Sequence, residues 1–255
     1  MQERLKEANE LQLQVLETRE KIIGGEHLDT LDDMSCLVGM YWNQGRSNTE
    51  DWLKKTEDLE VQIMEASKKA FGCEDLRTLE TMNNIANVYW DQGWNEKELW
   101  RIQQRWKKAA ELREQILETR TRVFGAAHPE VLTDTNVLGL TYRGLGMCET
   151  EDLQIQEQWK KAEELHEYVM SVRKRVLGAE HPDTLRSMID MAFTYKMQRR
   201  HEKAEEWLTS TGDVISIYKV QGRWKEAEEL EIEIMAIRDH DDEERDPMES
   251  GTMAS

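Results

Sequence analysis

One eight-residue pattern recurs four times along this 255-residue chain and constrains its fold more than any other feature. The copies are GGEHLDTL (24–31), GCEDLRTL (72–79), GAAHPEVL (125–132) and GAEHPDTL (178–185), at steps of 48, 53 and 53 residues. A tyrosine stands ten residues after the last leucine of each copy: Tyr41, Tyr89, Tyr142 and Tyr195. Two features that keep the same spacing four times indicate a chain built from internal repeats.

A third pattern precedes each octet and sets the length of the repeat. LKEANEL, LKKTEDL, WKKAAEL and WKKAEEL each begin 19 residues before the first glycine of an octet, and WKEAEEL (224–230) is a fifth copy without that glycine. Only the spacing between a tyrosine and the next block varies. When that variation is removed, a constant unit of 42 residues remains, with insertions at one fixed point.

Each unit has the pattern of a helical hairpin. A first helix is predicted to begin within the octet, where Pro129 and Pro182 suit the first helical position and Asp75 is a good cap. Its apolar residues recur at helical spacing, and a glycine is predicted to end it, namely Gly45, Gly93 or Gly146. A second helix runs from the KKA or KEA block to the next glycine. Its apolar stripe comprises Ala162, Leu165, Val169, Val172 and Val176.

These residues resemble a known family. Met82-x-x-Ile85-Ala86-x-x-Tyr89 and its counterparts are similar to the first helix of the tetratricopeptide repeat, and Ala109, Ala162, Ala204 and Ala227 match the small position of its second helix. The long unit, the HPDTL segment and QGRWKEAEEL resemble kinesin light chain and the repeat arrays of fungal nucleotide-binding receptor-like proteins. The resemblance covers about residues 5–238. It implies an all-α fold, a right-handed superhelical solenoid of antiparallel helix pairs, and a non-enzymatic module that binds proteins.

The repeat predicts the organisation of the whole chain. We expect a lone second helix at 5–23, units at about 24–71, 72–124, 125–177 and 178–208, a shortened unit at 209–238, and an acidic disordered tail at 239–255. In the shortened region, TSTGD (209–213) is predicted to join 201–208 directly to the next first helix. Either this module is a compact cap, or coding sequence is missing from the gene model.

Two insertions, around 94–104 and 147–157, carry about 11 residues each. Eleven residues make close to three helical turns, so we expect longer second helices at these places. Trp94 and Trp100 are then candidate anchors on an exposed ridge. The alternative is that both tryptophans pack against the insertion of the neighbouring unit.

Charge and cysteine content narrow the possible functions. The 52 acidic residues outnumber the 34 basic ones, and a formal charge of −18 opposes nucleic-acid or anionic-membrane binding as the main activity. Cys36, Cys73 and Cys148 form no CxxC pair, which argues against a disulfide framework or a zinc site. No signal-peptide pattern or long apolar run is present. We therefore expect a soluble cytoplasmic protein.

The sequence offers no convincing catalytic or cofactor site. His27, His128 and His181 occupy equivalent positions, with Asp75 at the fourth, which favours a role at helix starts. His166, His201 and His240 are isolated and are expected to be structural. There is no HExxH pair, no GxxxxGK[ST] loop and no GxSxG elbow, so neither metal, cofactor nor enzymatic activity is expected.

The family resemblance implies that the first helices line a concave groove that binds an extended peptide. Transferred to this chain, the candidate groove residues are Trp42, Asn83, Asn87, Trp90, Asn136, Arg143, Arg186 and Lys196. Because the basic members lie in the later units, we expect a ligand with an aromatic or apolar portion over units one and two and an acidic portion over units three and four. The alternative is that the tryptophans pack at interfaces and the basic residues are merely solvated.

Three kinds of function remain open from the sequence. The chain is an adaptor that binds partner proteins in the groove, a structural piece that self-associates through residues 5–23, or an accessory array of a larger kinesin light chain-like or receptor-like protein. The second possibility arises because an unpaired helix at 5–23 should leave an apolar stripe uncovered.

Overall fold

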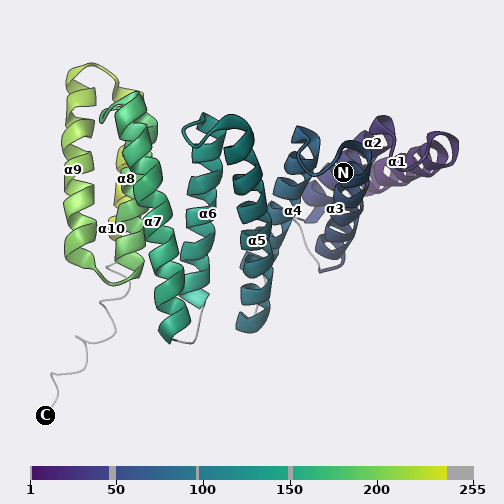
Figure 1. The fold of residues 1–255 in the computed structure, drawn as a ribbon, viewed down its shortest axis with the longest axis horizontal. Coiled ribbons are helices and arrows are strands. Elements are labelled where there is room, and N and C mark those ends of the chain that lie inside the picture. Colours follow the sequence, from purple (N-terminus) through teal and green to yellow (C-terminus); the bar gives the residue numbers. More distant parts are fainter. Residues whose placement is uncertain (1, 46–49, 96–97, 149–151, 240–255) are drawn as a thin grey trace, which may run out of the picture. The chain divides into compact units, whose positions relative to one another are not determined.

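The computed structural model describes residues 2–45, 50–95, 98–148 and 152–239, and these ranges form ten α-helices without a strand (Figure 1). The all-α prediction is therefore confirmed. The helices are α1 Gln2–Ile23, α2 Leu28–Gly45, α3 Glu50–Phe71, α4 Leu76–Asn95, α5 Leu99–Phe124, α6 Pro129–Cys148, α7 Asp152–Leu177, α8 Pro182–Met197, α9 His201–Val220 and α10 Trp224–Asp239. Within the described residues, no helix has the length and apolar character needed to cross a membrane.

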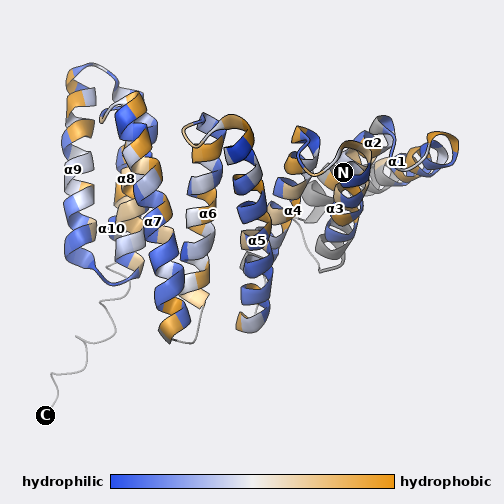
Figure 2. Ribbon diagram, viewed as in Figure 1, coloured by the Kyte–Doolittle hydropathy of each residue, from blue (hydrophilic) through white to orange (hydrophobic). Residues whose placement is uncertain are grey.

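The chain divides into two compact units, Met1–Asp134 and Thr135–Ser255, which are described separately. In unit 1, Leu31 and Leu37 of α2 pack with Leu16 of α1 and Ile63 of α3. In unit 2, one core joins α8, α9 and α10. Figure 2 shows α5 mainly in the hydrophilic colour on its visible side. Each unit is thus held together by the apolar stripes of successive helices.

The octets form the connections that lead from second helices into first helices. Gly24, Gly72, Gly125 and Gly178 all have positive φ, between 86° and 95°, a conformation that ends the preceding helix at little steric cost only for glycine. The residue directly before α6 is His128, and the residue directly before α8 is His181. Each histidine therefore occupies the capping position of its helix. The octet therefore combines a helix stop with a helix start.

The histidines of the octets act as helix caps. Nδ1 of His27, His128 and His181 accepts a hydrogen bond from the backbone N–H two residues later, at 3.2, 3.3 and 3.2 Å. At the fourth position, Oδ1 of Asp75 accepts the N–H of Arg77 at 3.0 Å. Each side chain satisfies one of the N–H groups that a helix start leaves without an intrahelical partner. The prediction that these residues serve helix starts is confirmed.

Small residues lie where first and second helices approach each other, as the repeat pattern predicted. Ala86 of α4 and Ala109 of α5 are fully buried in one cluster with Tyr89. In unit 2, Ala192 of α8 and Ala227 of α10 are likewise fully buried. A side chain without γ atoms lets the two helix backbones come close, and the tyrosine fills the adjoining space.

The prediction that Gly93 and Gly146 end their helices is wrong. Both lie inside helices, because α4 continues to Asn95 and α6 to Cys148. A Cβ atom at Gly93 would lie 2.1 Å from Nε1 of Trp106, and one at Gly146 would lie 2.8 Å from Cε2 of Trp159. The glycines are needed because an indole from the following helix packs directly on the backbone.

The insertions lengthen helices on both sides of the connection. The second helices α5 and α7 have 26 residues each, against 22 in α3, which confirms the expected longer second helices. The remaining inserted residues extend the ends of the first helices α4 and α6 or lie in the connections. Residues 96–97 and 149–151 of those connections are outside the described part.

The C-terminal region differs from its predicted division. The predicted boundary between residues 208 and 209 falls inside α9, which runs without interruption from His201 to Val220. Its buried residues are Ala204, Leu208, Thr211, Ile215 and Tyr218, at helical spacing through the TSTGD segment. Ala204 occupies the small position of a second helix, and Tyr218 the tyrosine position of a first helix. One helix therefore serves two successive pairs. The predicted tail at 240–255 lies outside the described residues.

Candidate protein-interaction surface

Three predicted groove residues of unit 1 lie on successive turns of α4. The Trp90 ring stacks on Trp106 of α5, with centroids 4.6 Å apart and planes inclined by 22°, and the Trp106 N–H donates to the Trp90 carbonyl at 2.9 Å. Asn83 is half-buried and Asn87 is exposed. Trp90 is thus partly used for helix packing, as the alternative interpretation held. The side chain of Trp42 lies outside the described residues.

An arginine that the sequence interpretation missed joins this group. Arg113 of α5 donates from Nη2 to Oδ1 of Asn87 at 3.0 Å, and its guanidinium lies 5.6 Å from the Trp90 ring centroid. Arg113 is buried, and burial lowers its pKa to about 10. In unit 1 the structure therefore brings Asn87, Trp90 and Arg113 together.

In unit 2, two predicted residues belong to a cluster of side chains from α6 and α8, which we call the α6–α8 groove after its predicted role. The cluster comprises Asn136, Arg143, Asp190 and Phe193. Nδ2 of Asn136 on α6 donates to Oδ2 of Asp190 on α8 at 2.9 Å. The Arg143 guanidinium lies 4.3 Å from the Phe193 ring centroid, and its Nη1 is 3.9 Å from Oδ1 of Asp190. Burial lowers the pKa of Arg143 to about 10, although Asp190 opposes that shift.

The α6–α8 groove leaves two polar atoms without hydrogen bonds. Within the described residues, Oδ1 of Asn136 and Nη1 of Arg143 are buried and have no hydrogen-bond partner. The 3.9 Å separation from Asp190 is an ion-pair distance and is too long for a hydrogen bond. An acceptor and a donor therefore lie unused in the same small region.

His166 of α7, for which the sequence predicts a structural role, lies close to this groove. It is fully buried, and its Nδ1 lies 3.1 Å from Oγ1 of Thr194. Its pKa is lowered to about 4, mainly by burial and also by nearby Arg143, while Asp190 opposes the shift. Gly139 makes room for the ring, since a Cβ there would lie 2.5 Å from Nε2.

The position of His166 in the repeat carries buried ionisable residues in three successive second helices. Arg113 of α5 and Glu60 of α3 are its equivalents, seven residues after the start of the block, and both are buried. Burial raises the pKa of Glu60 to about 7. Aligning the repeated blocks would have revealed this position from the sequence. An ionisable residue that recurs at one fixed position within an apolar stripe is unusual.

The last two predicted groove residues do not form part of a free basic surface. Arg186 of α8 is exposed and pairs with Glu233 of α10, at 3.4 Å between Nε and Oε1. Lys196 is only 6% exposed, and its Nζ donates to the carbonyls of Ile237 and Arg238 at the end of α10. A lysine at these carbonyls stabilises the C-terminal end of that helix.

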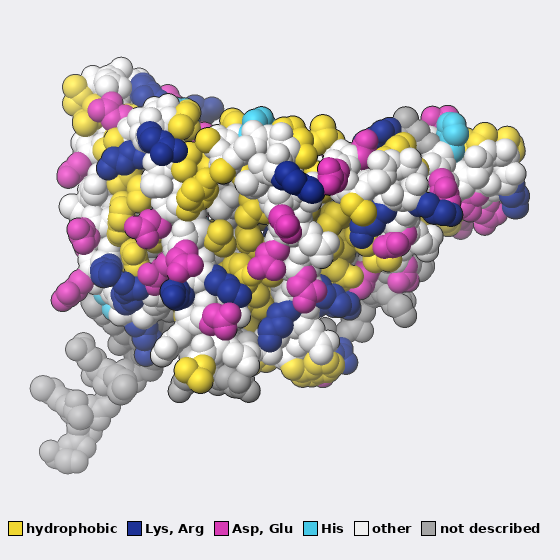
Figure 3. Space-filling view, in the orientation of Figure 1, with side chains coloured by type: hydrophobic (Ala, Val, Ile, Leu, Met, Phe, Trp, Pro, Cys, Tyr) yellow, Lys and Arg dark blue, Asp and Glu magenta, His cyan; other side chains and the backbone are white. Residues whose placement is uncertain are grey.

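Ion pairing changes the expected electrostatics of the surface. Arg143 and Arg186, two of the basic residues predicted for the groove, each face a carboxylate. Figure 3 shows acidic and basic side chains interspersed over the visible face rather than segregated. The sequence alone suggested a locally positive groove, but these pairs leave its described part close to neutral.

Trp100, at the start of α5, is 54% exposed. Its N–H donates to Oε2 of Glu98 at 2.8 Å, and Arg101 lies 5.3 Å from its ring centroid. This exposure agrees with the ridge interpretation of the insertion. The side chain of Trp94, the other candidate anchor, lies outside the described residues.

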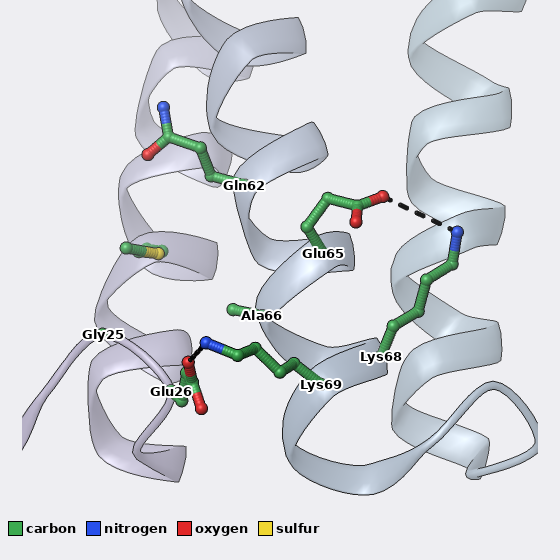
Figure 4. A pocket seen from close by; sticks show the side chains of 8 residues that line it. Gly25, Glu26, Gln62, Glu65, Ala66, Lys68 and Lys69 are labelled. Carbon is green, nitrogen blue, oxygen red and sulfur yellow. Dashed lines mark hydrogen bonds and ion pairs between the residues drawn. The ribbon is translucent and has the colours of Figure 1, made fainter.

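A cavity of about 650 Å³ opens beside α3 in unit 1. Figure 4 shows its lining, in which Lys69 of α3 reaches Glu26 before α2 and Lys68 lies within ion-pair distance of Glu65. Since these charges are matched within the cavity, they do not select a charged ligand. Among the described residues, no group of three or more His, Cys, Asp or Glu side chains is placed to hold a metal ion.

Comparisons with known proteins agree with this architecture. Models of the tetratricopeptide repeat match residues 1–29 and 151–211. A search of curated proteins found no match in sequence. Among solved structures, a protein from Podospora anserina described as a kinesin light chain with nearly identical TPR-like repeats is similar. It has a TM-score of 0.66 and 23% identity over 86% of this chain and 90% of that one.

A second solved structure, BtubC (BKLC) from P. vanneervenii, has a TM-score of 0.60 and 18% identity over 85% of this chain and 75% of that one. At these identities the similarities establish the fold. The solenoid of paired helices predicted from the repeat is confirmed.

Proposed function

We propose that this chain, a tetratricopeptide repeat protein, is a non-enzymatic interaction module that binds a partner polypeptide along its first helices. The observation that carries the proposal is the α6–α8 groove. It combines an unused acceptor on Asn136, an unused donor on Arg143 and the aromatic ring of Phe193.

The unused atoms of the groove match what an extended peptide offers. An unsatisfied buried polar group costs about 1–3 kcal/mol, so a ligand that satisfies it gains affinity. A polypeptide backbone presents one N–H and one carbonyl at nearly every residue. Because both atoms are buried, we propose that the two side chains turn toward the peptide on binding. A peptide N–H then donates to Oδ1 of Asn136, a peptide carbonyl accepts from Nη1 of Arg143, and Phe193 contacts an apolar side chain.

The paired charges determine which part of the ligand this groove recognises. Because Asp190 already faces Arg143, an incoming carboxylate gains less from the arginine than it would from an isolated one. We therefore expect the groove to select backbone and apolar groups. On α4, Asn83, Asn87 and Trp90 offer similar amide and aromatic groups in unit 1.

The proposal is tested with peptides selected from a random displayed library on the intact chain. In the double variant Asn136→Ala, Arg143→Ala, the affinity of groove-binding peptides is expected to fall at least about tenfold, measured by fluorescence anisotropy. Arg186→Ala is the control, because it removes an exposed arginine outside the α6–α8 groove. Equal loss in both variants, or no peptide sensitive to the double variant, would contradict this function.

A second candidate function is self-association through α1. Its side chains Leu11, Val15 and Ile22 are exposed, at 63%, 42% and 74%. Exposed apolar stripes of this kind commonly mark interaction surfaces. This alternative corresponds to the interpretation of residues 5–23 as an uncovered second helix.

Light scattering separates this alternative from a monomeric module. If α1 mediates self-association, the mass of the chain rises with concentration, and Leu11→Lys with Ile22→Lys restores the monomer mass of about 30 kDa. Ile232→Lys on α10, where the side chain is also exposed, should leave the mass unchanged. A wild-type chain that stays monomeric at all concentrations rules the alternative out.

A further inference from the structure

Unit 2 contains a second cavity, which we call the edge cleft. It has a volume of about 490 Å³ and lies between the first turns of α7 and the turn from α8 to α9. Ile155, Trp159 and Met197 contribute apolar surface to its lining, and Lys160, Arg199 and Arg200 contribute positive charge. None of these residues belongs to the α6–α8 groove.

The insertion before α7 provides one wall of the edge cleft. Ile155 and the neighbouring Gln156 come from the residues that lengthen α7. Trp159 is held in place by Gly146, against whose backbone the indole packs. The 42-residue repeat alone would not place Ile155 here, so the cleft is a consequence of the insertion.

The charge of the cleft is opposite to that of the chain. Three cations and one carboxylate, Glu163, line it, although the chain carries a net charge of −18. Arg200 already binds Glu163 and lies over the Tyr195 ring, and Nζ of Lys160 lies 3.8 Å from Oε1 of Glu164. The Arg199 guanidinium has no ion-pair partner in the part of the chain that the structure describes, and it therefore remains available for a carboxylate.

Two local features accompany this free charge. Arg199 has φ of 58°, and it is the one non-glycine residue with positive φ among those described. A side chain at such a position is strained, and glycine would be favoured there for stability alone. Next to it, Gln198 accepts from Arg200 at 2.8 Å through Oε1, while its buried Nε2 has no acceptor within the described residues.

We propose that the edge cleft binds a partner's peptide segment in which an apolar side chain stands next to a carboxylate. The apolar side chain packs among Ile155, Trp159 and Met197, and the carboxylate pairs with Arg199. The buried amide of Gln198 turns toward the peptide, and a backbone carbonyl of the peptide accepts from its Nε2. Complementary charge and apolar contact thus coincide at a surface separate from the α6–α8 groove.

The test selects displayed random peptides on the full chain and measures the affinity of the synthesised peptides by anisotropy. Peptides with an apolar residue beside Asp or Glu are expected, and Arg199→Gly should weaken them at least about tenfold. The same substitution relieves backbone strain, so it should leave the thermal midpoint unchanged or raise it. If Arg199 had only a structural role, its substitution would not abolish binding while leaving the stability of the chain unchanged.

Matched variants make the outcome decisive. Ile155→Glu should abolish binding, whereas Ile102→Glu, at the same position of the preceding unit, should not. The Asn136→Ala, Arg143→Ala variant should leave these peptides unaffected, so failure of the groove proposal is distinguishable from failure of this one. The inference is overturned if no selected peptide responds to Arg199→Gly.

The acidic residues that follow α10 provide a further control. The full chain with Asp241, Asp242, Glu243 and Glu244 changed to Asn or Gln should bind the peptides with the same affinity as the wild type. A clear gain in affinity would mean that the chain's own acidic segment occupies the cleft, which would overturn a partner peptide as its occupant.

Discussion

Gly93→Ala is expected to lower the free energy of unfolding of unit 1 by about 2 kcal/mol. A Cβ atom there would lie 2.1 Å from Nε1 and 2.4 Å from Cδ1 of Trp106. The indole must therefore move, which weakens its bond to the Trp90 carbonyl and its stacking on Trp90. Overpacking costs about 1–3 kcal/mol and the hydrogen bond about 1, while alanine recovers about 1 kcal/mol of helix propensity. Denaturant unfolding measures the net effect.

Gly212→Ala is the matched control and should have the opposite sign. Gly212 lies in the middle of α9, and a Cβ atom there would meet nothing within 4 Å. The substitution should stabilise unit 2 by up to about 1 kcal/mol, because helix propensity is then the main term. If Gly93→Ala stabilised the chain to the same extent, the close packing of Trp106 on α4 would be refuted.

The second large expected effect concerns the pH dependence of the free energy of unfolding, which should have opposite signs in the two units. Glu60 has a folded-state pKa of about 7 against an ordinary value of 4.5, so its contribution to stability is complete below pH 4.5. That contribution is lost as the pH rises from 4.5 through 7, by about 3 kcal/mol in total. Glu60→Gln should abolish this loss and make unit 1 more stable than the wild type at pH 8.

His166 gives the reverse behaviour in unit 2. Its folded-state pKa of about 4 lies below the ordinary value of 6.5, so its contribution is complete above pH 6.5. About 3 kcal/mol is lost as the pH falls from 6.5 through 4, because the unfolded chain binds the proton more tightly. His166→Leu should remove this dependence, since Leu208 occupies the same repeat position in α9 and is buried there.

Denaturant unfolding of the wild type and both variants at several pH values between 4 and 8 measures these dependences. Glu164→Gln is the control and should change neither pH dependence, because the Glu164 side chain is exposed although it lies only two residues before His166. Identical pH profiles for the wild type and the Glu60→Gln variant would show that the carboxyl is solvated.

The fold could be predicted from the sequence because the repeat supplies four independent views of one hairpin. Helix starts at Pro129 and Pro182 and caps at the histidines followed from local rules that act within a few residues. Gly93 and Gly146 were misinterpreted because glycine suits both a helix end and a close approach. The tryptophan that explains each glycine lies 13 residues further on, so the choice depends on tertiary packing.

The candidate site was less predictable, since ion pairs depend on which residues the packing of the helices brings together. The sequence identified Asn136 and Arg143, but Asp190 is 54 and 47 positions away from them, and no local pattern links it to them. Lys196 occupies the same repeat position as Arg143, yet it is buried against the end of α10. That difference arises from the shortened period at the C-terminal end, which brings α10 close to α8.

The fusion of two helices into α9 also affects how the array loses its structure. In an ordinary repeat array each pair contacts only its neighbours, so unfolding can proceed stepwise along the chain. Here α8, α9 and α10 share one apolar core, and no flexible connection interrupts α9. Both halves of α9 contact α10, since Glu205 pairs with Arg238 and Lys219 pairs with Glu231. Fraying of one of these helices therefore removes apolar contacts from the other two. The segment from α8 to α10 should accordingly exchange its amide protons as a single cooperative block.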